Sequence, residues 1–344
     1  MPSTQELDVA APSARLEKQR LHLIDVGPLF GSAGGEAGEA ARGAVIAQIR
    51  KACRETGFFY IHNTCISDDL IGATLEQMQR FFSLDDSDPA KRCALNKLSA
   101  GGTGWGPMFE EPAYQPGTVA HLESFDMSPP MEWIGDEGVA ASLGIYPNLW
   151  PGLPGFKTVA EIYYLSAREL SEALFEALAE AMGLPRAYFR NKATRKAPST
   201  MRFLNYPGRA VTSDRSNVGI AAHTDFEFFT LMYQTAPGLG LTDINGQWCD
   251  APANVGQFTV ILGDMMERLT NGEFPATGHR VGITPWQRYS IILFNALDGD
   301  CEVAPLPEFT SEERPARYAA TTQSRHIEEE LKRAEEFRES ERIS

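Results

Sequence analysis

Apolar residues recur at two different spacings along the chain, and these spacings separate a helical part from a strand-rich part. Spacings typical of helices occur over 43–56, 68–83 and 158–182. Gly57 is expected to end the first of these helices and Gly183 the last. Short apolar runs at 21–26 and 58–61 predict two strands in the same part of the chain.

From residue 199 onward the pattern changes to short apolar runs separated by turn residues. Asn245-Gly246 lies between two such runs and indicates a hairpin, because both residue types tolerate positive φ. Many short strands are typical of a sandwich or barrel. We expect an α+β chain with a mainly β core, a double-stranded β-helix of the jelly-roll type flanked by helices. The expected strands are 200–206, 218–224, 228–234, 240–244, 247–251, 257–262, 278–283 and 288–295.

These patterns divide the chain into four segments. Residues 1–20 are polar and patternless, so we expect them to be disordered. We expect residues 21–198 to form an α/β region that packs on the core, and residues 199–310 to form the jelly-roll core itself. Residues 311–344 are highly charged and predict a solvated C-terminal helix. Within the second segment, 94–155 is rich in Gly and Pro and too long for a plain loop, so we expect it to cover a site.

Charge and cysteine usage narrow the class of protein. The formal net charge is −15 for 344 residues, which argues against a nucleic-acid partner and against an anionic membrane surface. No apolar run is long enough for a transmembrane helix, and no secretory signal is visible. The five cysteines are scattered and never form a Cys-x-x-Cys pair, so we expect reduced thiols in a cytoplasmic enzyme. Nothing in the sequence indicates an oligomeric state.

Two histidines and one aspartate are the candidate metal ligands. His223-Thr224-Asp225 lies at the end of the expected strand 218–224, and residues two apart in a strand share a face. His279 falls in a later strand. Taken singly, each has a plainer interpretation as a chance pair or a buried core residue. Together, two histidines and one carboxylate match the facial triad of non-haem iron(II) oxygenases.

Arg288 and Ser290 form a second candidate site. They are two residues apart in an expected strand and therefore share a face. A buried arginine is costly unless it meets an anion, and its planar fork suits a carboxylate. The Ser290 hydroxyl could add a further hydrogen bond. The plainer alternative is a structural salt bridge to an Asp or Glu.

With these residues in place, the chain resembles the isopenicillin N synthase-like family of iron(II)/2-oxoglutarate-dependent dioxygenases. The resemblance covers about 21–310, with the motifs in the family's order. The matching strings are LIDV at 23–26, GFFY at 57–60, ESFD at 123–126, NLWP at 148–151, MRFLNYP at 201–207, AHTD at 222–225, LGDM at 262–265, TNG at 270–272, GHRV at 278–281 and RYS at 288–290.

The resemblance implies a role for each candidate residue. His223, Asp225 and His279 would bind Fe(II). Arg288 and Ser290 would bind the distal carboxylate of 2-oxoglutarate, and the Tyr206 hydroxyl would contact this co-substrate. Dioxygen would complete the reaction, in which a small organic substrate is hydroxylated or desaturated while 2-oxoglutarate gives succinate and carbon dioxide.

The sequence departs from the family pattern at a few positions. Leu204 stands where plant members often carry Asn, so Asn205 receives no assigned role. Glu227 stands where many members have Gly or Ser. It could bind a cationic substrate group or a water, but we favour a salt bridge at the rim. Phe226, Phe228 and Phe229 are interpreted as core residues.

Three alternatives remain open. The first is an oxidase of the same family that uses the Arg288 and Ser290 pair for a different anion and does not use 2-oxoglutarate. The second is a catalytically silent jelly-roll binding protein, against which the complete triad argues. The third is a zinc hydrolase, which is disfavoured because the chain has no His-Glu-x-x-His helix.

The aromatic residues of 100–126, including Trp105, Phe109 and Tyr114, are expected to line the entrance to the active site.

Overall fold

The structure is a computed structural model that describes residues 21–31, 35–111, 114–115, 117–210, 217–253 and 258–342. The disorder expected for residues 1–20 lies outside the described residues.

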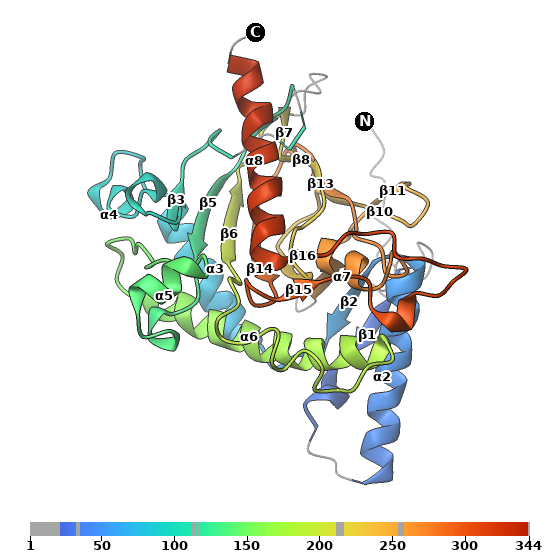
Figure 1. The fold of residues 1–344 in the computed structure, drawn as a ribbon. Helices are drawn as coiled ribbons and strands as arrows, with labels where there is room; N and C mark the ends of the chain where they lie inside the picture. The colour runs from blue at the N-terminus through green and yellow to red at the C-terminus, as the bar shows by residue number, and fades with distance from the viewer. Residues whose placement is uncertain are drawn as a thin grey trace, which may run out of the picture.

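The larger of two facing sheets has eight strands, antiparallel except for one parallel pair at its edge (Figure 1). Its central strands are almost entirely buried, because one face packs on helices and the other on the second sheet. In spatial order the strands are β1 (Leu23–Asp25), β2 (Phe58–His62), β12 (Phe258–Leu262), β9 (Phe229–Gln234), β14 (Arg288–Asn295), β6 (Met201–Tyr206), β5 (Glu123–Met127) and β3 (Gly104–Gly106).

The smaller sheet has four antiparallel strands and packs on the inner face of the larger one. Leu239, Leu241 and Val281 of the smaller sheet share one buried cluster with Leu204 and Met232 of the larger sheet. This pairing of sheets is the jelly roll, and the fold prediction is confirmed. In order the strands are β11 (Trp248–Asp250), β10 (Leu239–Thr242), β13 (His279–Val281) and β8 (Ile220–His223). Two short pairs join β4 (Val119–Ala120) to β7 (Asn217–Val218), and β15 (Glu302–Val303) to β16 (Thr321–Thr322).

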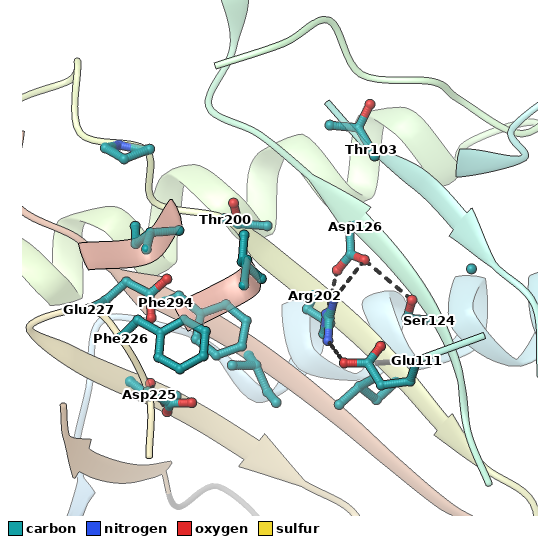
Figure 2. Close-up of a pocket in the computed structure, with 18 of the residues that line it drawn as sticks. Thr103, Glu111, Ser124, Asp126, Thr200, Arg202, Asp225, Phe226, Glu227 and Phe294 are labelled. Atoms are coloured by element: carbon teal, nitrogen blue, oxygen red, sulfur yellow. Dashed lines mark hydrogen bonds and ion pairs between the residues drawn. The ribbon is translucent and has the colours of Figure 1, made fainter. Parts of the chain in front are cut away.

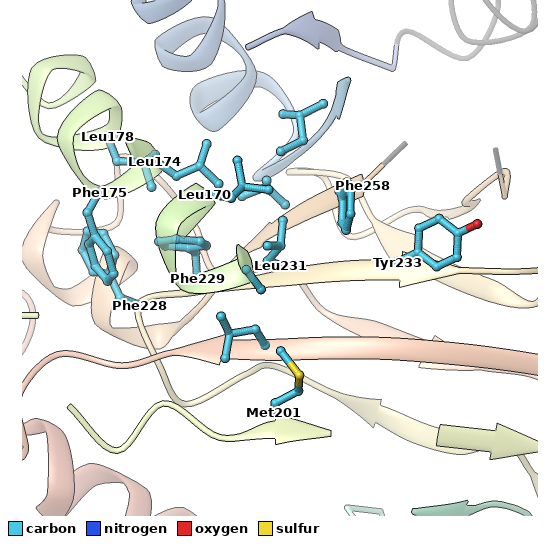
Figure 3. Close-up of a cluster of buried hydrophobic side chains, with 14 of the residues drawn as sticks. Leu170, Leu174, Phe175, Leu178, Met201, Phe228, Phe229, Leu231, Tyr233 and Phe258 are labelled. Atoms are coloured by element: carbon cyan, nitrogen blue, oxygen red, sulfur yellow. The ribbon is translucent and has the colours of Figure 1, made fainter. Parts of the chain in front are cut away.

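Helix α6 (Phe156–Ala181) covers the outer face of the larger sheet (Figure 3). Its side chains Leu170, Leu174 and Leu178 recur every four residues, so they point from one side of the helix onto the sheet. Burying a side chain of this size contributes about 1.5–3 kcal/mol. Phe175 stacks on Phe228 at 5.2 Å between ring centres, and Phe229 is fully buried beside it. Phe228 and Phe229 are thus core residues, as predicted.

The other helices lie around this core. The long ones are α2 (Glu36–Glu55), α3 (Asp68–Phe82) and α8 (Gln323–Arg342), and the short ones are α4 (Pro89–Arg92), α5 (Glu137–Ser142) and α7 (Asp264–Leu269). Single turns of 3₁₀ helix occur at Gly27–Leu29, Asn96–Leu98, Met131–Trp133 and Pro307–Phe309. None of the helices described is both long and apolar enough to cross a membrane.

Several elements differ from the sequence pattern. The C-terminal helix α8 begins at Gln323, not at the start of the charged segment 311–344. Helix α2 begins at Glu36, several residues before the expected start at 43, because its first turns consist mostly of strong helix formers such as Ala and Glu. Strand β5 lies inside the 94–155 segment, where little regular structure was expected. All five of its residues are buried, and three of them are polar, so it shows no alternation to detect. The region 21–198 therefore contributes four strands to the larger sheet.

Candidate metal centre

His223 and His279 face each other across two neighbouring strands of the smaller sheet. His223 ends β8, His279 begins β13, and the two residues are partners in the antiparallel register. Their ring centres lie 4.3 Å apart. The Nε2 atoms of His223 and His279 lie 3.7 and 3.5 Å from Oδ1 of Asp225. One possible ligand atom from each of the three residues falls within 4.8 Å of the others, so the chain brings the three predicted ligands together.

Backbone carbonyls orient both imidazoles. His223 Nδ1 donates to the carbonyl of Ala221 at 2.8 Å, and His279 Nδ1 donates to that of Thr277 at 3.1 Å. A proton held on Nδ1 leaves Nε2 with its lone pair, which is the form that binds metals. Burial, helped by the neighbouring His279, lowers the pKa of His223 to about 4. The donor set therefore fits a divalent transition metal.

Asp225 is placed by a loop and not by the strand that carries His223. Strand β8 ends at His223, and the chain turns before β9. The Asp225 carbonyl accepts a hydrogen bond from the Asp264 amide at 2.9 Å, and the Thr230 hydroxyl donates to the Asp225 carboxylate. The loop can lie this close to residue 263 because that residue is a glycine. A Cβ there would lie 3.0 Å from the Asp225 carbonyl oxygen and still closer to that of Glu227. The expectation that strand alternation sets the His223–Asp225 geometry is thus wrong, although the two side chains do meet.

Tyr114 supports the outer face of His223. The two rings stack with centres 4.4 Å apart and planes inclined by 16°. Tyr114 also lines the cavity at the metal centre, as expected of its segment. Trp105 instead lies in the core, where its Nε1 donates to Glu123 at 2.9 Å, and Phe109 is exposed.

Arg288 and Ser290 are fully buried on β14, in the larger sheet. Arg288 Nη2 donates to Gln234 Oε1 at 2.8 Å, and Nε donates to the carbonyl of Ala236 at 3.2 Å. Its Nη1 and the Ser290 hydroxyl have no hydrogen-bond partner among the described residues, and no carboxylate pairs with the guanidinium there. Leaving buried polar groups unpaired costs about 1–3 kcal/mol each, so this pair of groups fits a bound anion better than a structural salt bridge.

A cavity of about 710 Å³ lies between the sheets and contains the metal centre. His223, Asp225 and His279 line it, and so does Tyr206, whose ring lies 4.8 Å from the Arg288 guanidinium. Arg288 and Ser290 do not themselves line it. One side of α8 does, through Ser324, Ile327, Glu328 and Leu331, so the C-terminal helix is not simply solvated.

Comparison with known proteins agrees with this geometry. Residues 21–152 match the family model described as non-haem dioxygenase in morphine synthesis N-terminal, and residues 198–296 match that of the 2OG-Fe(II) oxygenase superfamily, where 2OG is 2-oxoglutarate. A homoarginine-6-hydroxylase of Arabidopsis thaliana is 30% identical over 268 residues, covering 76% of this chain and 79% of the relative. The chain belongs to the 2OG-Fe(II) oxygenase superfamily.

Two further proteins extend the similarity over most of the chain. Another Arabidopsis thaliana homoarginine-6-hydroxylase is 29% identical over 316 residues, covering 90% of this chain and 86% of the relative. A 2OG-Fe(II) oxygenase family protein from Caulobacter crescentus has a crystal structure with a TM-score of 0.75 at 25% identity, covering 91% of this chain and 98% of that one. The predicted family, enzyme class and cofactors Fe(II), 2-oxoglutarate and dioxygen are confirmed, and the oxidase alternative is not favoured.

The oxygenase also carries a partly buried ion cluster that the sequence did not reveal (Figure 2). Arg202 Nε donates to Asp126 at 2.7 Å, and Arg202 Nη1 donates to Glu111 at 2.7 Å. Burial opposes the charge of Arg202, but Asp126 and Glu111 outweigh burial and raise the pKa of the guanidinium. The three residues are distant in sequence, and no spacing rule links them.

Glu227 lines the same cavity as His223, Asp225 and His279, the candidate metal ligands of the oxygenase. Burial and the neighbouring Asp225 raise the pKa of Glu227 to about 8. The expected rim salt bridge is absent within the described part of the chain. Phe226 also lines the cavity, which corrects its interpretation as a core residue. Leu204 faces the cavity, whereas Asn205 donates to Glu123 at 2.8 Å within the protein interior.

Proposed function

We propose that this oxygenase hydroxylates or desaturates a small organic molecule while 2-oxoglutarate is converted to succinate and carbon dioxide. The proposed iron ligands are His223, Asp225 and His279, and the proposed 2-oxoglutarate contacts are Tyr206, Arg288 and Ser290. The two relatives named homoarginine-6-hydroxylases support hydroxylation of a small molecule.

One observation carries the 2-oxoglutarate assignment. Arg288 Nη1 and Ser290 Oγ are buried donors without partners in the described structure, and they lie on one strand two residues apart. A carboxylate supplies the acceptors that both groups lack, and a charge-assisted, two-pronged contact with arginine is strong and directional. Tyr206 lies between this pair and the cavity, because its ring faces the guanidinium and lines the cavity wall.

The remaining residues position and shield the reacting groups. The carbonyls of Ala221 and Thr277 hold the imidazoles, the Thr230 hydroxyl orients the Asp225 carboxylate, and Tyr114 covers His223. The bound iron supplies the activation of dioxygen. A cavity of about 710 Å³ between two sheets limits the access of water to the substrate C–H bond.

The test is 2-oxoglutarate binding to Arg288→Lys, measured by calorimetry with Fe(II) in the absence of dioxygen. Lysine keeps the charge but loses the planar fork, which should cost roughly 1.5–3 kcal/mol and weaken binding about ten- to a hundredfold. Ser290→Ala should weaken binding less. Arg325→Lys, on the exposed part of α8, is the matched control and should bind as the wild type does. Unchanged binding by Arg288→Lys would contradict the assignment.

We also propose a cytoplasmic location. The five cysteines form no disulfide, which supports a reducing compartment. Microscopy of a fluorescent fusion in the source cells tests this, and a signal confined to another compartment would contradict it.

A further inference from the structure

The charged side chains that line the cavity are mostly acidic. One basic side chain, Arg202, faces six carboxylates in the described wall. The carboxylates are Glu110, Glu111, Asp126, Asp225, Glu227 and Glu328. Where these carboxyl groups are ionised, the wall favours a cationic group over an anionic one.

Most of these carboxylates have partners. Glu110 pairs with Lys97 at 2.6 Å. Glu111 and Asp126 both pair with Arg202, which leaves that cluster with one net negative charge (two carboxylates minus one guanidinium).

Asp225, Glu328 and Glu227 remain. The Asp225 carboxylate accepts a hydrogen bond from the Thr230 hydroxyl, and Asp225 is a proposed iron ligand. Glu328 is exposed on α8. Glu227 is partly shielded from solvent, and its carboxylate has no ion pair among the residues described here; only its own backbone amide donates to it. Withdrawing a carboxylate from water without a counter-ion is costly, so a cation that met it would be bound favourably.

The backbone fixes Glu227 close to the reaction centre. The carbonyl of Glu227 accepts a hydrogen bond from the Met265 amide at 3.2 Å, and Gly263 leaves no room between α7 and this loop. Glu227 follows the proposed ligand Asp225 by two residues. Figure 2 shows Asp225 and Glu227 on one side of the pocket and the Arg202 cluster on the other, with Phe226 and Phe294 drawn between them. A group bound by Glu227 would thus be held at a set position relative to the iron.

The helix α8 closes the wall beside Glu227. The Gln323 amide donates to the Phe226 carbonyl at 3.0 Å and its oxygen accepts from the Leu297 amide at 3.1 Å, while His326 pairs with Asp264 at 2.8 Å. These contacts tie the helix to the loop that carries Glu227. The Glu227 carboxylate therefore lies in a part of the cavity wall that these contacts hold in place.

We propose that the substrate carries a cationic side-chain nitrogen, an ammonium or guanidinium group, and that Glu227 is the specificity residue that binds it. This inference rests on the proposed function. Neutral analogues lose the ion pair, and anionic substrates meet both Glu227 and the net negative charge of the Arg202 cluster. The phenyl rings of Phe226 and Phe294 would pack on the carbon skeleton between the charged end and the opposite wall.

The experiment uses pairs of probes that differ in the charge of one side-chain nitrogen, and the arginine and homoarginine pairs also keep nearly the same shape. L-arginine is compared with L-citrulline, L-homoarginine with L-homocitrulline and L-lysine with Nε-acetyl-L-lysine, and indole-3-acetate serves as an anionic probe. Binding to the protein loaded with Fe(II) and 2-oxoglutarate is measured by calorimetry without dioxygen, and succinate release is measured with dioxygen. We expect at least one cationic probe to bind and to stimulate succinate release, and its neutral partner to bind about ten- to a hundredfold more weakly.

Two substitutions at Glu227 test whether this residue causes the preference for cationic probes. Glu227→Gln keeps the shape and removes the charge, so it should raise the KM for the cationic probe about ten- to a hundredfold and erase the preference over the neutral partner. Glu227→Asp should restore part of the preference. Glu329→Gln is the matched control, since Glu329 is exposed on α8 and pairs with Arg325 outside the cavity. Iron affinity and Tm show whether each variant has kept its metal centre.

Several outcomes would overturn the inference. They are a panel in which no cation binds, a preference for neutral or anionic probes, and a cation preference that survives in Glu227→Gln. Binding of 2-oxoglutarate alone separates these results from failure of the proposed function. A protein that binds 2-oxoglutarate through Arg288 but shows no cation preference refutes only the substrate class, whereas one that does not bind 2-oxoglutarate refutes the proposed function itself.

Discussion

The ring of Tyr114 lies 4.4 Å from that of His223 and is nearly parallel to it, so a residue of the irregular 94–155 segment supports a proposed iron ligand. Aromatic pairs of this kind contribute about 0.5–1.5 kcal/mol beyond burial. Tyr114→Ala should therefore weaken Fe(II) binding by up to about tenfold, as measured by competition with a chelator. Tyr114→Phe keeps the ring and serves as the control. Equal affinities in all three proteins would show that the stacking has no role.

Removal of any one triad residue should abolish turnover without unfolding the chain. His223→Ala, Asp225→Ala and His279→Ala each leave two ligands, which no longer form a facial triad. We expect no Fe(II)-dependent succinate formation, with circular dichroism like that of the metal-free wild type. Turnover by purified His279→Ala supplied with iron would refute the ligand assignment.

Gly263→Ala should damage the metal centre from outside it. The new Cβ would press on the carbonyls of Asp225 and Glu227, so the ligand loop must shift. We expect a loss of about 1–3 kcal/mol in the free energy of unfolding, together with weaker Fe(II) binding. Gly72→Ala is the matched control, because open space surrounds that helical glycine and alanine should stabilise it by up to about 1 kcal/mol. If both variants behave alike in urea unfolding, the close approach at Gly263 is not what positions Asp225.

Loosening α8 should uncouple the reaction. Gln323→Ala leaves the Leu297 amide and the Phe226 carbonyl without their partner, at a cost of about 1–3 kcal/mol in stability. The helix should then close the cavity poorly, so that the ratio of succinate to oxidised product rises above one. Gln323→Glu keeps an acceptor for the Leu297 amide. Its ratio of succinate to oxidised product should therefore lie between those of the wild type and Gln323→Ala. An unchanged ratio in Gln323→Ala would argue that α8 has no part in closing the cavity.

Much of the strand core was predictable because its pattern is local. Strands β6, β9, β12 and β14 lie within a residue or so of the expected ranges, since buried β-branched and aromatic runs between turns are unambiguous. Strand β5 could not be found this way. Its buried Glu123 and Asp126 are stabilised by Lys91 and Arg202, and those ion pairs join segments far apart in the sequence.

The site, like the fold, could be predicted from the sequence only in part. His223, Asp225 and His279 could be named from residue type and order, and the structure brings them together, but their geometry comes from the contact of Gly263 with the loop. The support of Tyr114 for His223, and the cavity-facing side of α8, depend on tertiary packing. The charged residues of α8 indicate its solvent-facing side but give no sign of the side that faces the cavity.

The two proposed histidine ligands and the proposed co-substrate anchor belong to different sheets. The histidines are on β8 and β13 of the smaller sheet, whereas Arg288 and Ser290 are on β14 of the larger one. A 2-oxoglutarate molecule bound at both ends would act as a strut that fastens the two layers together. Succinate is one carbon shorter and has lost the 2-oxo group, so it would no longer hold the metal end firmly. The link between the two sheets would then be lost at the end of each turnover.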